Sequence, residues 1–282
     1  MKNATAMAIC FAALVLSSAV RADDSGLSEI SVDLKMDEMD YVSGEPIRAT
    51  IEVKNLSPFP VSVGRPASVD KLFVEVFRES DMGKLDVLGD APFVEPFRID
   101  MNQGQTLETR LAEHFYLLEP RRFLARPVLL HRGYRYEGAY RVFAVQAGIE
   151  TGKAVQLFSN REGLRREFTL LRWPRNNMDH LFVMARDSGT SSMRWQTTDV
   201  GPFMRITPPT ISILPGGEVI VMHRAGMDNF VRSEFWSMPD VMELRTRQSV
   251  LDPDTAGQVR VQEEYKKSGG VKPTPRPWWK FW

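Results

Sequence analysis

Cysteine and histidine are scarce in this chain of 282 residues, which holds one Cys and four His. A single cysteine excludes an intramolecular disulfide framework and any zinc site built from several thiolates. Four scattered histidines leave little for a histidine-based metal cluster, so we expect neither a metal nor another cofactor. Lys and Arg together number 36, as do Asp and Glu, and this lack of a basic excess argues against a nucleic-acid partner.

Motifs for catalysis are also lacking. The sequence holds no Gly-x-Ser-x-Gly nucleophile elbow, no glycine-rich loop that leads into a helix and no His-Glu-x-x-His zinc motif. Asp179 and His180 are neighbours, but adjacent residues of a strand point to opposite faces, so this pair does not make a proton relay by itself. We therefore predict no catalytic residue and a protein that is not an enzyme.

The first 22 residues have the three-part layout of a secretory signal. Lys2 supplies a positive start, residues 6–16 are an apolar run that contains Cys10, and Ala22 has the small side chain that a signal peptidase requires. Removing this segment, with Lys2, Arg21 and Cys10, leaves 34 basic against 36 acidic residues and no cysteine. We expect an exported protein of the periplasm or the extracellular medium, with membrane association as an open alternative.

Polar and apolar residues alternate with a period of two over much of the remaining chain. In one example, Ile47, Ala49, Ile51 and Val53 alternate with polar side chains. This pattern places one face of a strand on a core and the other in water. Short strands separated by turn residues are typical of β-sandwiches. We predict an all-β fold with two tandem Ig-like or FnIII-like sandwich domains, at residues 27–160 and 164–250, and a flexible C-terminal tail at residues 251–282.

Two segments carry a resemblance to a known family. One begins with Gly44-Glu45-Pro46-Ile47 and continues through Val53, Asn55, Pro60 and Val61, and the other is Gly138-Ala139-Tyr140-Arg141-Val142. They resemble patterns found in bacterial exported Ig-like domains of the proteinase-inhibitor and macroglobulin-like type. The resemblance covers residues 30–150 and implies a sandwich in which the Gly-Glu turn joins the first two strands. It also implies a secreted proteinase inhibitor as an alternative function. From its place in the second segment, we expect Tyr140 to fill the core.

A group of arginines lies within 21 residues, and Glu137 is the only acidic residue among them. If several of these side chains share a face, they form a strip that binds a polyanion such as an acidic glycan. The alternative is that they are solvated charges of strand faces and loops. The residues are Arg121, Arg122, Arg126, Arg132, Arg135 and Arg141.

The tail at residues 251–282 ends in a cluster of aromatic residues. Residues 272–277 alternate with proline and should be extended, and the chain closes with Trp278, Trp279, Lys280, Phe281 and Trp282. Tryptophan favours membrane interfaces and protein grooves, and Lys and Arg are attracted to anionic head groups. We predict that this end contacts another envelope or extracellular protein, a membrane surface or an acidic glycan, with packing on its own domains as the alternative.

Taken together, these features predict a non-catalytic binding or scaffold module of the bacterial envelope, with contacts through sandwich loops, a strand edge and the tail. The sequence predicts no oligomeric state. A further alternative is a hydrolase with its site at the domain junction. That alternative requires a cleft in which His180 or His223 lies within hydrogen-bond reach of a carboxylate and a serine.

Overall fold

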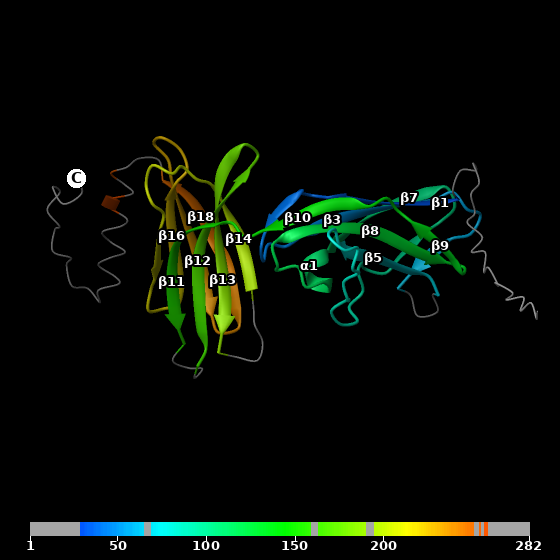
Figure 1. Cartoon of the computed structure of the whole chain (residues 1–282), viewed down its shortest axis with the longest axis horizontal. Coiled ribbons are helices and arrows are strands. Elements are labelled where there is room, and N and C mark those ends of the chain that lie inside the picture. The colour runs from blue at the N-terminus through cyan, green and yellow to red at the C-terminus, as the bar shows by residue number, and fades with distance from the viewer. Residues whose placement is uncertain are drawn as a thin grey trace, which may run out of the picture.

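Figure 1 shows the chain as a computed structural model, which describes residues 29–64, 69–158, 163–189 and 195–250 together with residues 254, 257 and 258. These residues are mostly in strands, with α1 (Leu111–His114) a single helical turn, so the prediction of an all-β fold is confirmed. The strands are β1 (Ile30–Met36), β2 (Asp40–Val42), β3 (Arg48–Asn55), β4 (Val61–Val63), β5 (Lys71–Arg78), β6 (Phe97–Ile99), β7 (Gln103–Arg110), β8 (Arg121–His131), β9 (Tyr134–Glu137), β10 (Arg141–Gln146), β11 (Ile149–Leu157), β12 (Arg165–Arg175), β13 (Met178–Ser188), β14 (Trp195–Pro202), β15 (Thr210–Ile213), β16 (Glu218–Arg224), β17 (Phe230–Met238) and β18 (Val241–Val250).

Strands β1–β10, called here the first part, surround one hydrophobic core. Strands β1, β3 and β7 form one sheet, and β2, β10, β8 and β5 form another in that order, with β9 paired to β8. The predicted alternation of residues 47–53 places Ile51 and Val53 inside, fully buried, and leaves Arg48 exposed. Val74 on β5 and Phe123 on β8 reach the same cluster from the second sheet.

Strands β11–β18, the second part, surround a separate core. They form two four-stranded antiparallel sheets, β11-β12-β13-β14 and β15-β16-β17-β18. Phe168 and Leu181 from the first of these sheets pack with Val221 and Phe235 from the second. The turn at residues 215–217 joins β15 to β16, as the apolar runs on either side of its two glycines predict.

Two strand assignments differ from the sequence prediction. The strand at the end of the predicted 27–160 domain is β11, and it pairs with β12, so it belongs to a sheet of the second part. The alternation of side chains predicts a strand but not the neighbour with which it pairs. The sequence predicts a separate strand over residues 202–206, but Pro202 is the last residue of β14 and residues 205–206 form a turn.

The expectation that Tyr140 fills the core is wrong, since its side chain is 41% exposed. The backbone packs closely against β1 at Gly138, where a Cβ would lie 2.5 Å from the Val32 carbonyl oxygen. The Tyr140 ring then lies outside the core, edge-on to Phe77 at 5.8 Å between ring centroids.

The predicted signal at residues 1–22 and nearly all of the predicted tail, including Trp278–Trp282, lie outside the described residues. The helices found among the described residues are all too short to cross a membrane.

Candidate functional site

The turn at Ser43-Gly44-Glu45, which carries the family resemblance, contacts the second part of the chain. It connects β2 to β3 and lies against β14. The Thr197 N–H donates to the Gly44 carbonyl oxygen at 2.9 Å, and the Thr197 hydroxyl donates to the Ser43 carbonyl oxygen at 2.6 Å. Gly44 has a φ of +84°, and a Cβ there would lie 2.5 Å from the Trp195 ring, so glycine is required both by the backbone and by the contact.

A buried ion pair joins the same turn to the end of β12. The Arg175 guanidinium donates to both oxygens of the Glu45 carboxylate, at 3.0 and 2.9 Å, and Glu45 also accepts the Val42 N–H at 2.6 Å. The Glu45 residue is 7% exposed. Burial raises the pKa of Glu45, and the Arg175 hydrogen bonds and the Val42 N–H oppose that rise. An ion pair with this two-point geometry fixes the direction as well as the distance between two elements.

Apolar packing supports the ion pair. Val42 at the end of β2 packs with Leu171 on β12 and Phe182 on β13, and all three are buried. The Arg175 guanidinium lies 5.0 Å from the centre of the Phe182 ring. The junction between the two parts therefore combines a hydrophobic contact with a polar one, which together hold one relative orientation.

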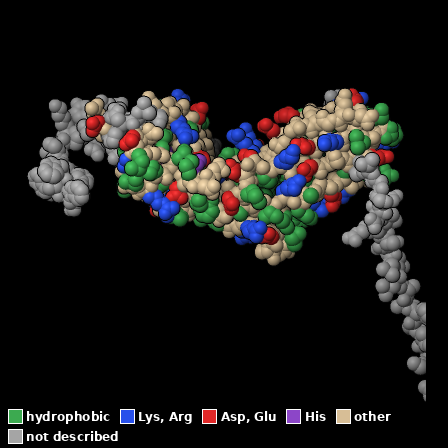
Figure 2. Space-filling model, turned by 90° about the horizontal axis from the view of Figure 1, so that it is seen from above, with side chains coloured by type: hydrophobic (Ala, Val, Ile, Leu, Met, Phe, Trp, Pro, Cys, Tyr) green, Lys and Arg blue, Asp and Glu red, His purple; other side chains and the backbone are tan. Residues whose placement is uncertain are grey.

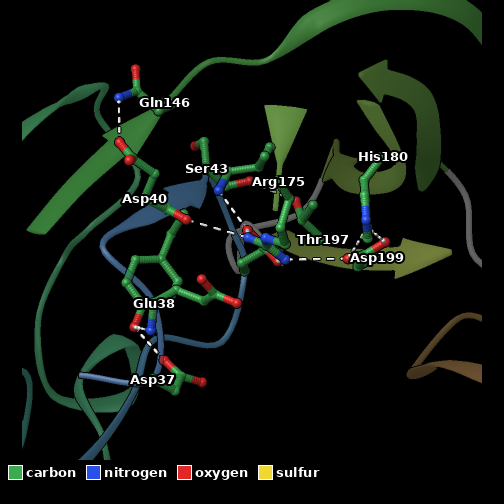
Figure 3. Close-up of polar contacts among 12 residues, drawn as sticks. Asp37, Glu38, Asp40, Ser43, Gln146, Arg175, His180, Thr197 and Asp199 are labelled. Carbon is green, nitrogen blue, oxygen red and sulfur yellow. Dashed lines mark hydrogen bonds and ion pairs between the residues drawn. The ribbon is translucent and has the colours of Figure 1, made fainter. Parts of the chain in front are cut away.

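Figure 3 shows that Asp199 on β14 lies between Arg175 and His180. Arg175 donates to one Asp199 oxygen at 3.2 Å, the His180 Nδ1 lies 2.9 Å from that oxygen, and the Gly201 N–H donates to the other at 2.7 Å. Asp179 instead binds Arg205 and Arg172. As expected for adjacent strand residues, Asp179 and His180 have separate partners.

A cleft with a volume of about 830 Å³ opens at this junction. Its lining includes five carboxylates and three guanidinium groups, so its charge is net negative: Asp37, Glu38, Glu45, Glu113, Asp199, Arg48, Arg110 and Arg175. Tyr41 also lines the cleft, and its hydroxyl donates to the Asp37 carboxylate. Burial and that carboxylate raise the pKa of Tyr41 far above its usual value, so the phenol stays protonated. Its hydroxyl also accepts the Glu38 N–H at 3.1 Å.

The arrangement meets part of the requirement stated above for a hydrolase. His180 has a carboxylate partner, whereas His223 on β16 donates from its Nε2 to the Pro202 carbonyl oxygen at 3.0 Å. In the described ranges no serine hydroxyl hydrogen-bonds to either histidine. Those same ranges hold no group of three or more His, Cys, Asp or Glu side chains arranged to bind a metal ion.

His223 predicts a pH dependence of stability. It is fully buried, its Nδ1 has no hydrogen-bond partner among the described residues, and burial lowers its pKa from 6.5 to about 4. The unfolded chain therefore binds a proton between pH 6.5 and 4 that the folded chain does not bind. The stabilising effect of a neutral His223 is complete above pH 6.5, and we expect the chain to lose about 3 kcal/mol as the pH falls to 4.

Urea unfolding at pH 7, 5.5 and 4 checks this expectation. In His223→Gln, which keeps a side-chain donor but cannot gain a proton, the unfolding free energy should change less between pH 7 and 4 than in the parent. The carboxylates titrate equally in both proteins, so the comparison isolates the histidine. Parallel pH profiles in the two proteins would contradict the assignment.

The structure separates the arginines of the predicted polyanion strip. Arg126 and Arg135 come together on Glu75, at 2.9 and 2.8 Å, and Lys84 binds the same carboxylate at 2.6 Å. Burial would raise the pKa of Glu75, but the hydrogen bonds from Lys84 and Arg126 outweigh it and lower the pKa. The others have partners elsewhere: Arg121 with Glu119, Arg122 with Glu79, Arg132 with the Phe59 ring and Arg141 with Asp33. Polyanion binding by these arginines stays a prediction, and a polyanion would have to compete with the carboxylates.

The junction residues were not predicted from the sequence as a site. The Ser43-Gly44-Glu45 turn was predicted only as the connection between two strands, and Arg175 and Asp199 carried no signal. Arg175 directly precedes Asn176-Asn177, whose φ angles of +51° and +63° form the tight turn from β12 to β13.

The chain was compared with known families, curated proteins and solved structures. No family model and no curated protein matches the chain. The crystal structure of Spo0M, a sporulation control protein from Bacillus subtilis, is similar over 61% of this chain and 91% of that chain, with 10% sequence identity and a TM-score of 0.30.

Proposed function

We propose that this protein is an exported, non-catalytic binding or scaffold module of the bacterial envelope, built from two tandem Ig-like or FnIII-like sandwich domains. Two features support the division into domains. The first and second parts have separate hydrophobic cores, and among the described residues each core is enclosed by sheets of its own part, three in the first and two in the second. The signal-like first 22 residues support export.

One observation carries the non-catalytic assignment: the charged groups at the junction are used to join the two parts. Arg175 donates to the carboxylates of Glu45 and Asp199 and to the Asp40 carbonyl oxygen of the first part. His180 in turn contacts Asp199 through its Nδ1. A reacting centre needs a nucleophile or a proton donor directed at an open position. Here the same types of group instead fix the orientation of two β-sheet units, which is what a binding surface shared by both units requires.

The charge of the junction cleft indicates the class of partner. Five carboxylates against three guanidinium groups favour a positively charged segment of another protein. Glu113 is exposed and Glu38 is half-buried at the cleft, so both carboxylates can be reached by such a segment, although Glu113 also pairs with Arg110 at 3.1 Å. The predicted contacts of the tail, at residues 278–282, would add to this interaction.

Capture of proteins from an envelope extract by the mature chain tests the proposal. We expect a partner that is retained at low salt and released as the salt concentration rises, because exposed charges are screened. Glu38→Lys with Glu113→Lys should weaken its capture at least tenfold. Asp90→Lys with Glu150→Lys, which makes the same change of charge at exposed positions outside the cleft, is the matched control.

A third variant, in which residues 278–282 are removed, separates the tail from the cleft. Loss of capture with this variant and not with the cleft variant assigns the partner to the tail. Loss of thermal stability in the same variant would instead support packing of the tail on its own domains. Equal capture by the cleft variant and its control would rule out the cleft as the binding surface.

A hydrolase with its site at the junction is the second candidate, because His180 and Asp199 form a histidine–carboxylate pair at 2.9 Å beside the cleft. A panel of ester, peptide and glycoside substrates tests it. Turnover that is abolished in His180→Ala, while the thermal unfolding midpoint is unchanged, would replace the binding proposal by this one. We expect no such turnover.

A further inference from the structure

The end of the first part farthest from the junction exposes a set of apolar side chains on its loops. Their exposed fractions lie between 45% and 79%, and we call them the tip patch: Leu56, Phe59, Val69, Met101 and Tyr134. Strand direction places them together: β3 runs from Arg48 at the junction cleft to Asn55, and β7 runs from Gln103 to Arg110 at the cleft. Figure 1 shows the ends of β1, β7 and β9 at this pole, and Figure 2 shows hydrophobic side chains gathered there.

Side-chain contacts join the loops that carry the tip patch. The Arg132 guanidinium lies 3.6 Å from the centre of the Phe59 ring, which connects the β8–β9 hairpin to the β3–β4 loop. His131 pairs with Tyr134 across that hairpin and bonds to Asp70, the neighbour of Val69, at 2.9 Å. The tip patch is therefore one surface made by several loops.

The loop that carries Leu56 and Phe59 is held from beneath by Asn55. The Asn55 side chain is fully buried and donates to the carbonyl oxygens of Phe59, at 2.8 Å, and Ile99, at 3.2 Å. Its oxygen accepts the Ser57 N–H at 3.0 Å and the Ser57 hydroxyl at 2.7 Å. The apolar side chains are thus presented by a fixed backbone, so inserting them into another phase costs little backbone ordering.

Positive charge surrounds the tip patch. Lys54, Lys71 and Arg132 are exposed at the same ends of their strands. Each lies two residues from a member of the tip patch: Lys54 from Leu56, Lys71 from Val69 and Arg132 from Tyr134. Of the carboxylates nearby, Asp70 is buried against His131, Asp100 pairs with Arg98 at 2.9 Å, and Glu29 is exposed. Exposed apolar side chains bordered by cations match an anionic membrane surface, in which the acyl chains receive the former and the head groups attract the latter.

We propose that the tip patch is a membrane-docking surface for anionic phospholipids, distinct from the junction cleft and from the tail. The docked side chains are those of Leu56, Phe59 and Tyr134, with Lys54, Lys71 and Arg132 at the head-group level. Tyrosine is suited to this position because its ring is apolar and its hydroxyl remains hydrated. Docking at this pole leaves the junction cleft facing away from the membrane, where it is open to a protein partner.

Sedimentation of the mature full chain with lipid vesicles tests the proposal. We expect binding to vesicles of phosphatidylglycerol and phosphatidylethanolamine, and much weaker binding to phosphatidylcholine alone. Leu56→Ser with Phe59→Ser should weaken binding about tenfold or more, because two apolar side chains no longer enter the bilayer. Val155→Ser with Leu157→Ser, at exposed apolar positions of β11 in the second part, is the matched control.

Charge and tail variants complete the design. Lys54→Gln, Lys71→Gln and Arg132→Gln together should reduce binding to the anionic vesicles and remove the preference over phosphatidylcholine. Trp278→Ala, Trp279→Ala and Trp282→Ala in the full chain should leave the effect of the tip variants in place. Unfolding midpoints within about 2 °C of the parent confirm that the tip-patch, charge and β11 variants fold, since the side chains replaced in them are exposed.

Three outcomes would overturn the proposal. The first is the absence of vesicle binding by the parent chain, and the second is a loss of vesicle binding in the β11 control as large as that in the Leu56 and Phe59 variant. The third is vesicle binding that depends on the tail tryptophans and not on Leu56 and Phe59. Stoichiometric capture of a protein that is lost in the tip variant, without vesicle binding, would assign the tip patch to a protein partner instead.

Discussion

Replacing Arg166 by methionine is expected to lower the unfolding free energy by about 3–5 kcal/mol, because it leaves a buried carboxylate without its partner. Arg166 on β12 is 2% exposed and donates to both oxygens of Asp187 on β13, at 2.6 and 2.9 Å. Its remaining nitrogen donates to the Ser237 hydroxyl and to the carbonyl oxygens of Met238 and Val241, at 3.0, 2.9 and 3.2 Å. One side chain thus links the two sheets of the second part at the turn between β17 and β18.

Urea unfolding of three variants measures this effect. The double variant Arg166→Met with Asp187→Leu should recover a large part of the loss, since both charges are then removed. Arg98→Met is the control, because the Arg98–Asp100 pair is about half exposed on both sides and such pairs contribute at most about 1 kcal/mol. A loss below about 1 kcal/mol in Arg166→Met, equal to that in the control, would mean that Asp187 finds other partners when the arginine is absent.

The strands could be predicted because their burial alternates with the sequence. Ile51 and Val53 face the core and Lys54 faces water, and polarity alone gives this division. The pairing of strands could not be predicted in the same way, because it is set by contacts between residues distant in sequence. This is why β11 was assigned to the wrong sheet, although a strand was expected there.

The sequence does not predict that Arg166 and Glu45 are buried, or that Arg175 is partly buried. Charged residues are mostly exposed, and a charged residue in an alternating strand is by default assigned to the solvent face. These three can leave water because each pairs with an opposite charge elsewhere in the chain: Glu45 with Arg175, and Arg166 with Asp187. The Gly44-Glu45 pattern marked the correct turn, but a turn motif carries no information on the surface against which it lies.

Replacing Arg175 by methionine is expected to loosen the junction between the two parts and to destabilise the chain by about 3–5 kcal/mol, since it leaves Glu45 buried without a counter-charge. Glu45→Gln should cost less, because the amide oxygen can still accept the Val42 N–H that the carboxylate accepts now. If the pair acts as one unit, the double variant will be less unstable than the sum of the two single losses. Arg205→Met, at a 65% exposed side chain that binds Asp179, is the control.

A readout specific to the junction distinguishes this effect from general loss of stability. With Arg175 replaced, the burial that raises the pKa of Glu45 is no longer opposed by the guanidinium, so the carboxyl resonance of Glu45 should titrate at a higher pH than in the parent. X-ray scattering should show a broader distribution of maximum dimensions, because the Val42 contact with Leu171 and Phe182 remains but the ion pair that sets its direction is gone. An unchanged Glu45 titration with an unchanged scattering profile would mean that the apolar contact and the Thr197 hydrogen bonds fix the orientation without the ion pair, and the cleft would then owe its shape to them.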